Sequence, residues 1–206
     1  MSVYDRDYFR DRWDGRGGPS AWGATRWILG LCVLSFVVDT FLTPLDFLAL
    51  FPAHILAGHR LWELLTTAFC HAGFIHLLFN MLCLWWTGQA LELHYGTRRF
   101  LALYVGGTLA ASLTYVAWAR WHGFPFPAVG ASGAIMALLV VYAFHNPRQT
   151  ILIYGIVPMQ IRWAVALYAL MDLSGTLSGG GVIANAAHLG GAAFGVAWGL
   201  WERRYR

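Results

Sequence analysis

Six stretches of the chain carry few charged side chains and are long enough, or nearly so, to cross a lipid bilayer. A helix needs about 20 consecutive apolar residues to span the hydrocarbon core, and polar residues gather between the stretches and in the N-terminal segment. The predicted spans are residues 26–43, 74–93, 99–119, 130–146, 160–176 and 184–202.

This pattern predicts an all-α fold, a polytopic membrane helix bundle of six transmembrane helices. The spans use most of the 206 residues, which leaves room for one bundle, residues 26–202, and no separate soluble domain. We expect residues 1–25 to form a flexible cytoplasmic N-terminal tail and residues 203–206 a cytoplasmic C-terminal end. The segment 44–73 is long for a loop, and such loops are usually functional. We expect it to lie partly in the outer interface, with Trp62 at headgroup depth.

Composition favours the same class of protein. The chain is 58% hydrophobic and 12% charged, and its mean hydropathy is +0.54. Soluble domains average about 25% charged residues, so the sequence predicts an integral multi-pass membrane protein. Acidic residues in the first 25 positions argue against a transit peptide, and no short apolar core with a cleavage site precedes the first span.

The basic residues predict the orientation of the bundle. All fourteen are arginines, and threading six spans from a cytoplasmic N-terminus places twelve of them inside and only Arg60 and Arg120 outside. Such a bias indicates that both termini are cytoplasmic, and we expect the bacterial cytoplasmic membrane. The arginines then orient the protein in the membrane and attract anionic lipid headgroups, and no nucleic-acid partner is implied.

This topology brings polar side chains of three spans to one level near the outer face. The stretch "GASGAIMALL" places Ser132 at the outer end of the fourth span. The second span enters with "HAGFIHLLFNML", in which His76 and Asn80 share one helical face. The sixth span carries His188 about one turn from its outer end. Ionisable residues inside a membrane are costly, so such a layer indicates a functional site.

Small residues give the fourth and sixth spans surfaces that can approach closely. Gly191, Gly195 and Gly199 follow His188 along one helical stripe, and the fourth span offers Gly130 and Gly133 among several alanines. Such stripes allow helix backbones to meet. Close packing of these two spans would bring His188 within reach of Ser132, and a nucleophilic serine needs a base that near.

Each feature also has a purely structural explanation. A "GASG" cluster is common at the start of a span, a lone histidine often packs, a glycine stripe indicates only a tight helix pair, and His76 with Asn80 could bridge helices. Their shared level is what favours chemistry. His71 and His76 are five apart, on different faces of a helix, and no H-E-x-x-H motif occurs, so we expect no metal and no cofactor. The three cysteines imply no disulfide framework.

The set of motifs resembles the rhomboid intramembrane serine proteases. "HAGFIHLLFNML", "GASGAIMALL" and "AHLGGAAFG" match in order and position, and Glu92 with the following "YGTRRF" turn also looks like the family pattern. The resemblance covers about residues 44–202. It implies a six-helix bundle around a water-filled cavity open to the outside.

The resemblance also implies roles for the layer. Ser132 is similar to the family nucleophile and His188 to its general base, while His76, Asn80 and the backbone N–H of Ser132 look like the oxyanion hole. Gly130 matches a position where backbone and substrate approach. The family uses a dyad without a required carboxylate. In agreement, none of the acids near span ends, which are Asp39, Glu92 and Asp172, is an obvious third member.

Two positions depart from the family pattern. Trp62-Glu63 stands where the family often has Trp-Arg. The reversed charge affects the expected anchoring of the outer loop or its contact with lipid, and not the chemistry. Met136 stands where some members have a tyrosine that stacks on the base, so His188 is expected to be held less rigidly.

The resemblance implies cleavage of single-span or multi-span membrane protein substrates near the outer face, with small residues preferred before the cut. Two alternatives remain open. One is a catalytically inactive rhomboid-like protein that binds membrane helices, although such relatives lack the nucleophile or the base. The other is a small transporter, although no convincing internal repeat is present and the polar layer is not at the midplane.

Overall fold

The computed structural model describes residues 23–153, 156–178 and 184–204, so the predicted tail lies outside the described residues except at its last positions. Each predicted span coincides with a helix to within three residues at either end. These helices are α2 (Ala24–Phe41), α5 (Phe74–Tyr95), α6 (Thr97–His122), α7 (Ser132–His145), α8 (Ile161–Leu177) and α9 (Asn185–Arg204).

The helices make a bundle typical of a membrane protein. By length and apolar composition, α2, α5 and α6 could each cross a bilayer, and α7 is a shorter apolar helix. Large apolar side chains are exposed along the bundle, among them Trp27, Phe79 and Leu170. Exposed apolar surface of this extent is unfavourable in water and favourable against lipid tails.

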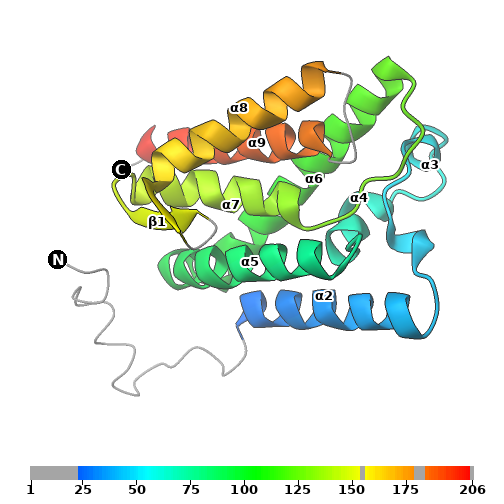
Figure 1. The fold of residues 1–206 in the computed structure, drawn as a ribbon, viewed down its shortest axis with the longest axis horizontal. Helices are drawn as coiled ribbons and strands as arrows, with labels where there is room; N and C mark the ends of the chain where they lie inside the picture. Colours follow the sequence, from blue (N-terminus) through cyan, green and yellow to red (C-terminus); the bar gives the residue numbers. More distant parts are fainter. Residues whose placement is uncertain (1–22, 154–155, 179–183, 205–206) are drawn as a thin grey trace.

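Helix α7 lies at the centre of the bundle. It packs against α5, α6, α8 and α9, and Figure 1 shows it in lime between α5 below and α8 and α9 above. Ten of its 14 residues are buried, and they include Ile135, Leu138 and Val141. The burial of α7 on all sides explains why its sequence is apolar without a polar face. Its first residue, Ser132, therefore starts inside the molecule.

Glu92 joins α2 to α5. Its carboxylate accepts hydrogen bonds from the backbone N–H groups of Ala24 at 2.7 Å and Thr25 at 2.9 Å. It also accepts from the hydroxyls of Thr25 and Thr97. The first N–H groups of a helix lack partners within the helix and carry partial positive charge. Glu92 thus caps α2 from the end of α5 and fixes the two helices side by side, as Figure 1 shows them.

Two connections contain short elements. The outer loop contains η2 (Asp46–Leu48), α3 (Pro52–Leu56), α4 (Glu63–Thr66) and η3 (Thr67–Phe69). Between α7 and α8 the strands β1 (Thr150–Ile153) and β2 (Val157–Gln160) pair antiparallel, with Thr150 opposite Gln160. This hairpin was not predicted from the sequence, so all-α describes the bundle and not every connection. Figure 1 places the hairpin at the opposite end of the bundle from α3.

Candidate active site

Ser132 is the first residue of α7, and the segment before it is fixed by the outer loop. The backbone N–H of Gly130 donates to the carbonyl of Thr67 at 3.0 Å. Leu50 and Ala128 exchange both backbone hydrogen bonds in an isolated bridge, and the Thr67 hydroxyl donates to the Ala128 carbonyl at 2.8 Å. The start of α7 is therefore positioned by residues of the outer loop, Leu50 and Thr67, which come much earlier in the sequence.

The structure brings Ser132 and His188 together. Ser132 Oγ and His188 Nε2 are 2.7 Å apart, within hydrogen-bonding distance. His188 lies in the first turn of α9, and its backbone N–H donates to the Ala184 carbonyl. Both side chains are half-buried. Two residues that lie 56 positions apart in the chain thus meet at a hydroxyl and an imidazole, which is the geometry of an activated nucleophile.

Glycines make this approach of α7 and α9 feasible. A β-carbon on Gly191 would overlap the backbone carbonyl of Gly133, and one on Gly195 would lie 2.7 Å from the carbonyl oxygen of Ala137. A β-carbon on Gly199 would lie 2.8 Å from the ring of Phe144. The glycine stripe of α9 therefore lies directly on α7, as small residues in membrane helices allow.

Asp172 corrects one inference from the sequence. None of the acids near span ends looked like a third member of the site, but Asp172 Oδ1 lies 3.0 Å from His188 Nδ1. Asp172 comes from α8 and is only 8% exposed. The sequence could not indicate this contact, because a separation of 16 positions between Asp172 and His188 leaves their distance in space undetermined. The described site is thus a chain of three groups, Ser132, His188 and Asp172.

The ring of His76 lies against Gly130, two residues before Ser132. A β-carbon on Gly130 would lie 2.7 Å from His76 Cε1, 2.9 Å from Nε2 and 3.7 Å from Ser132 Oγ. The backbone N–H of Ala72 donates to His76 Nδ1 at 3.3 Å. A neutral imidazole that accepts at Nδ1 carries its hydrogen on Nε2. In this arrangement His76 carries its hydrogen on Nε2, next to Gly130.

Asn80 lies one turn further along α5 and is buried. Its Nδ2 donates to the carbonyl oxygen of His76 at 2.8 Å. An amide nitrogen has a second hydrogen to donate, so this bond leaves one donor. In this structure the observed contact of Asn80 is with the backbone of the turn that carries His76.

His71 differs from the position that its spacing suggested. It precedes α5 and does not share that helix with His76, and the two rings lie 5.3 Å apart. His71 is 5% exposed, and neither ring nitrogen makes a side-chain hydrogen bond of good geometry. Burial, with a smaller contribution from His76, lowers the pKa of His71 to about 4. Within the described residues, no group of three or more His, Cys, Asp or Glu side chains could hold a metal ion.

A small cavity opens beside Ser132. Most of the residues that line it are small, and they include Thr67, Ala111, Ser112, Gly130, Gly133 and Ala187. Walls made of alanine, glycine and hydroxyl side chains leave room for a short substituent and exclude a large one. A small recess lined mostly by small residues therefore adjoins Ser132.

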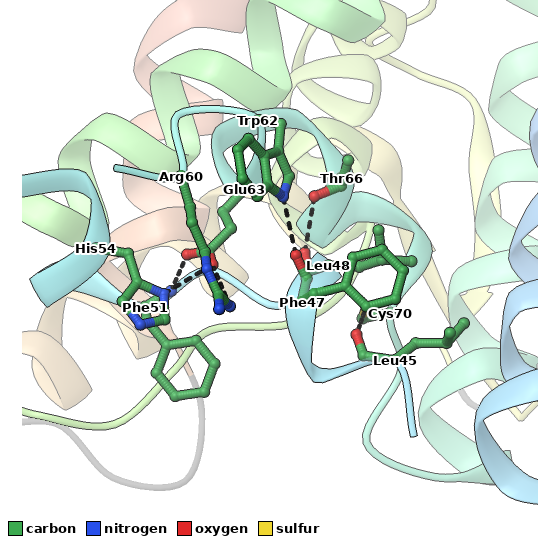
Figure 2. Close-up of polar contacts among 10 residues, drawn as sticks. All are labelled: Leu45, Phe47, Leu48, Phe51, His54, Arg60, Trp62, Glu63, Thr66 and Cys70. Atoms are coloured by element: carbon green, nitrogen blue, oxygen red, sulfur yellow. Dashed lines mark hydrogen bonds and ion pairs between the residues drawn. The ribbon is translucent and has the colours of Figure 1, made fainter. Parts of the chain in front are cut away.

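Glu63 anchors the outer loop that supports this site. Its side chain is 0% exposed. It accepts a hydrogen bond from the Phe51 backbone N–H at 2.9 Å, and it contacts His54 Nδ1 at 2.8 Å and Arg60 at 3.7 Å. Figure 2 shows these groups converging on the carboxylate, with the Trp62 indole N–H donating to the Phe47 carbonyl nearby. Glu63, the residue that departs from the Trp-Arg pattern, therefore links the two halves of the outer loop through its buried carboxylate.

Fold and site together define a helical integral membrane protein with a serine and a histidine in contact at one end of the bundle. A family model described as the Rhomboid domain matches residues 58–205. The chain belongs to the rhomboid family, which includes intramembrane serine proteases.

Relatives of the chain occur in bacteria and in mitochondria. The chain is 27% identical to "Rhomboid protease GlpG" of Serratia proteamaculans over 93% of this chain and 65% of that protein. It is 33% identical to "Rhomboid protease GluP" of Bacillus subtilis over 65% of this chain and 27% of that protein. It is 28% identical to "RHOMBOID-like protein 12, mitochondrial" of Arabidopsis thaliana over 79% of this chain and 51% of that protein. The chain spans less than two thirds of the length of each relative.

Proposed function

We propose that the chain is an intramembrane serine endopeptidase with Ser132 as nucleophile and His188 as general base. The observation that carries this proposal is the 2.7 Å separation of Ser132 Oγ and His188 Nε2. In the proposed arrangement all six long helices cross the membrane, and the arginine distribution puts both termini in the cytoplasm. The site then lies near the outer face.

The chemistry follows from the groups in contact. His188 Nε2 takes the proton of Ser132 Oγ while that oxygen forms a bond to the substrate carbonyl carbon. The carbonyl electron pair moves to its oxygen, and the protonated His188 then gives its proton to the leaving amine as the C–N bond breaks. Water then attacks the carbonyl carbon of the acyl-enzyme while His188 Nε2 takes its proton. The bond to Ser132 Oγ breaks, and His188 returns the proton to that oxygen.

The negative oxygen of the tetrahedral intermediate needs donors already in place. The His76 Nε2–H supports this role because His76 Nε2 and Ser132 Oγ both lie within 4 Å of the same point beside Gly130. The backbone N–H of Ser132 supports it because Ser132 is the first residue of α7, where N–H groups lack partners within the helix. Asn80 supports it more weakly, since its observed bond is to the His76 carbonyl. We propose His76 as the principal side-chain donor and Asn80 as the residue that stabilises its turn and supplies a second donor.

Membrane proteins with one or several spans are the proposed substrates. A helical carbonyl is already hydrogen-bonded, so the substrate must unwind before Ser132 can attack. A glycine in the substrate helix lowers that cost by about 1 kcal/mol relative to alanine. The small cavity beside Ser132 favours a small side chain immediately before the cut.

A reporter in liposomes tests the proposal. The reporter has one span with a Gly- and Ala-containing segment at its outer end, and mass spectrometry of the products locates the cut. The native chain should cleave after a small residue near the outer face, and Ser132→Ala and His188→Ala should not. Ser35→Ala is the matched control, because Ser35 lies in α2 and its hydroxyl makes no hydrogen bond. Its cleavage rate should equal that of the native chain.

Absence of cleavage by folded native chain, together with retained binding of the reporter, would instead favour a rhomboid-like protein that holds membrane helices. Cleavage that survives Ser132→Ala would contradict the assignment of the nucleophile.

A further inference from the structure

The carboxylate of Asp172 is directed at the imidazole nitrogen that faces away from Ser132. Oδ1 lies 3.0 Å from His188 Nδ1, while Nε2 of the same ring lies 2.7 Å from Ser132 Oγ. The side chains of His188 and Asp172 are 18% and 11% exposed. One imidazole is therefore held between an acid and a hydroxyl, contributed by three different helices.

This arrangement selects one tautomer of His188. An ionised carboxylate only accepts hydrogen bonds, so Nδ1 must carry the hydrogen that fills the contact with Asp172. The lone pair of a neutral ring is then on Nε2, where the hydroxyl of Ser132 can donate to it. The opposite tautomer would leave the carboxylate facing a lone pair and remove the proton acceptor from the serine.

The backbone that carries Asp172 is held in place independently of the carboxylate. The hydroxyl of Thr176 donates to the Asp172 carbonyl at 2.7 Å. A β-carbon on Gly175 would overlap the amide of Asn185, the first residue of α9. The ends of α8 and α9 are therefore packed closely beside the acid. A carboxylate buried in a membrane bundle is costly unless it is paired, and His188 is the side chain that contacts it in the described part of the chain.

We propose that Asp172 is a positioning residue that orients His188 and stabilises its imidazolium, so that the chain works with three aligned side chains. This inference rests on the proposed function. As Ser132 Oγ bonds to the substrate carbon, its proton moves to Nε2, and the positive ring stays hydrogen-bonded through Nδ1–H to the Asp172 carboxylate. Asp172 remains ionised throughout, and the proton on Nε2 leaves with the amine. His76 on α5 also interacts electrostatically with His188.

The test compares Asp172→Asn, Asp172→Ala and Asp172→Glu with the native chain in the liposome reporter. Asparagine keeps the shape but has an NH₂ group that can donate to Nδ1 and so supports the wrong tautomer. We expect kcat to fall about 10- to 100-fold in the Asn and Ala variants, a part of the 10²–10⁴ that a general base contributes. KM should not change, since Asp172 touches no substrate, and Glu should restore part of kcat. Asp39→Asn is the matched control, because Asp39 is an exposed acid on α2.

A spectroscopic readout separates positioning from a general loss of structure. Nitrogen-15 chemical shifts of the His188 ring should show hydrogen on Nδ1 in the native chain and a mixture of tautomers in Asp172→Asn. A kcat of Asp172→Asn equal to that of the native chain, or an unchanged tautomer of His188 in that variant, would overturn the inference about Asp172. The proposed function would still stand if Ser132→Ala and His188→Ala abolish cleavage. If the native chain proves inactive, the proposed function fails, and the ring nitrogen shifts still decide whether Asp172 sets the tautomer.

Discussion

The imidazole of His76 occupies the space beside Gly130 where a side chain would begin. A β-carbon on Gly130 would lie 2.7 Å from Cε1 of that ring, and Gly130 has φ of +120°. This backbone conformation is unfavourable for other residues, and glycine adopts it readily. Position 130 therefore requires glycine for two separate reasons, its backbone conformation and the closeness of the ring.

Gly130→Ala should displace His76 from the serine and slow cleavage by at least about 10-fold, since loss of one oxyanion donor costs about 10²–10³ in kcat. Gly58→Ala is a matched control for backbone strain alone, because Gly58 has φ of +72° and nothing lies within 4 Å of its added β-carbon. Both variants should lose about 1 kcal/mol of stability. Equal activities of the two variants, measured on the reporter, would contradict the placement of His76.

The contact between α7 and α9 predicts a large effect of one methyl group. Gly191→Ala places its β-carbon on the carbonyl of Gly133, so the helices must separate, at a cost of about 1–3 kcal/mol for overpacking. Gly30→Ala adds the same methyl to α2 with nothing within 4 Å and should stabilise the helix by about 0.5–1 kcal/mol. Unfolding in detergent measures both changes, and the reporter should show that Gly191→Ala also separates His188 from Ser132. A Gly191→Ala variant as stable and active as the native chain would rule out this close contact.

The buried carboxylate of Glu63 predicts that removing Glu63 destabilises the fold more than removing Arg60 does. Glu63→Ala leaves the Phe51 backbone N–H without its acceptor, and an unsatisfied buried donor costs about 1–3 kcal/mol. Arg60→Ala removes a 3.7 Å contact of a side chain that is 42% exposed, and such ion pairs contribute about 0–1 kcal/mol. In thermal unfolding, the Tm of Glu63→Ala should be well below the Tm of Arg60→Ala. Exchange of the Phe51 backbone amide hydrogen should accelerate only in Glu63→Ala. Equal stability losses would mean that the carboxylate does not hold the loop.

His71 predicts a loss of stability in acid. Burial lowers its pKa to about 4 from 6.5, so between these values the unfolded chain binds a proton that the folded chain does not. The free energy of unfolding should therefore fall as pH drops from about 6.5 to about 4, by up to about 3 kcal/mol from this residue. His71→Phe removes the titrating group and should flatten this part of the profile of unfolding against pH. An identical slope in the variant would show that His71 is not the source.

Long apolar runs located the helices well, because a helix able to cross a bilayer needs about 20 apolar residues, and the ends of α5 and α9 lie within two residues of the predicted ranges. The layer containing Ser132, His188 and His76 could be predicted from the sequence, since the six predicted spans and the arginine counting assigned these three residues to one expected level. The structure brings these three residues together.

Other features depend on contacts that spacing does not encode. Asp172 meets His188 because α8 packs on α9 at one particular rotation about its axis. The sequence of α8 does not specify that rotation, because its apolar residues do not form one distinct face. Glu63 looked like a reversed charge in a loop, and only the fold shows that its carboxylate is buried and accepts from Phe51. The hairpin of β1 and β2 was missed because its short apolar runs adjoin the α8 span in the sequence.

The most direct test of the central claim is to label the purified chain with a fluorescent serine-directed phosphonate and locate the adduct by mass spectrometry. We expect one adduct, on Ser132 Oγ, in the native chain, and none in His188→Ala, because the hydroxyl then lacks the base 2.7 Å away. An adduct on another residue, or equal labelling of Ser132 in folded His188→Ala, would contradict it.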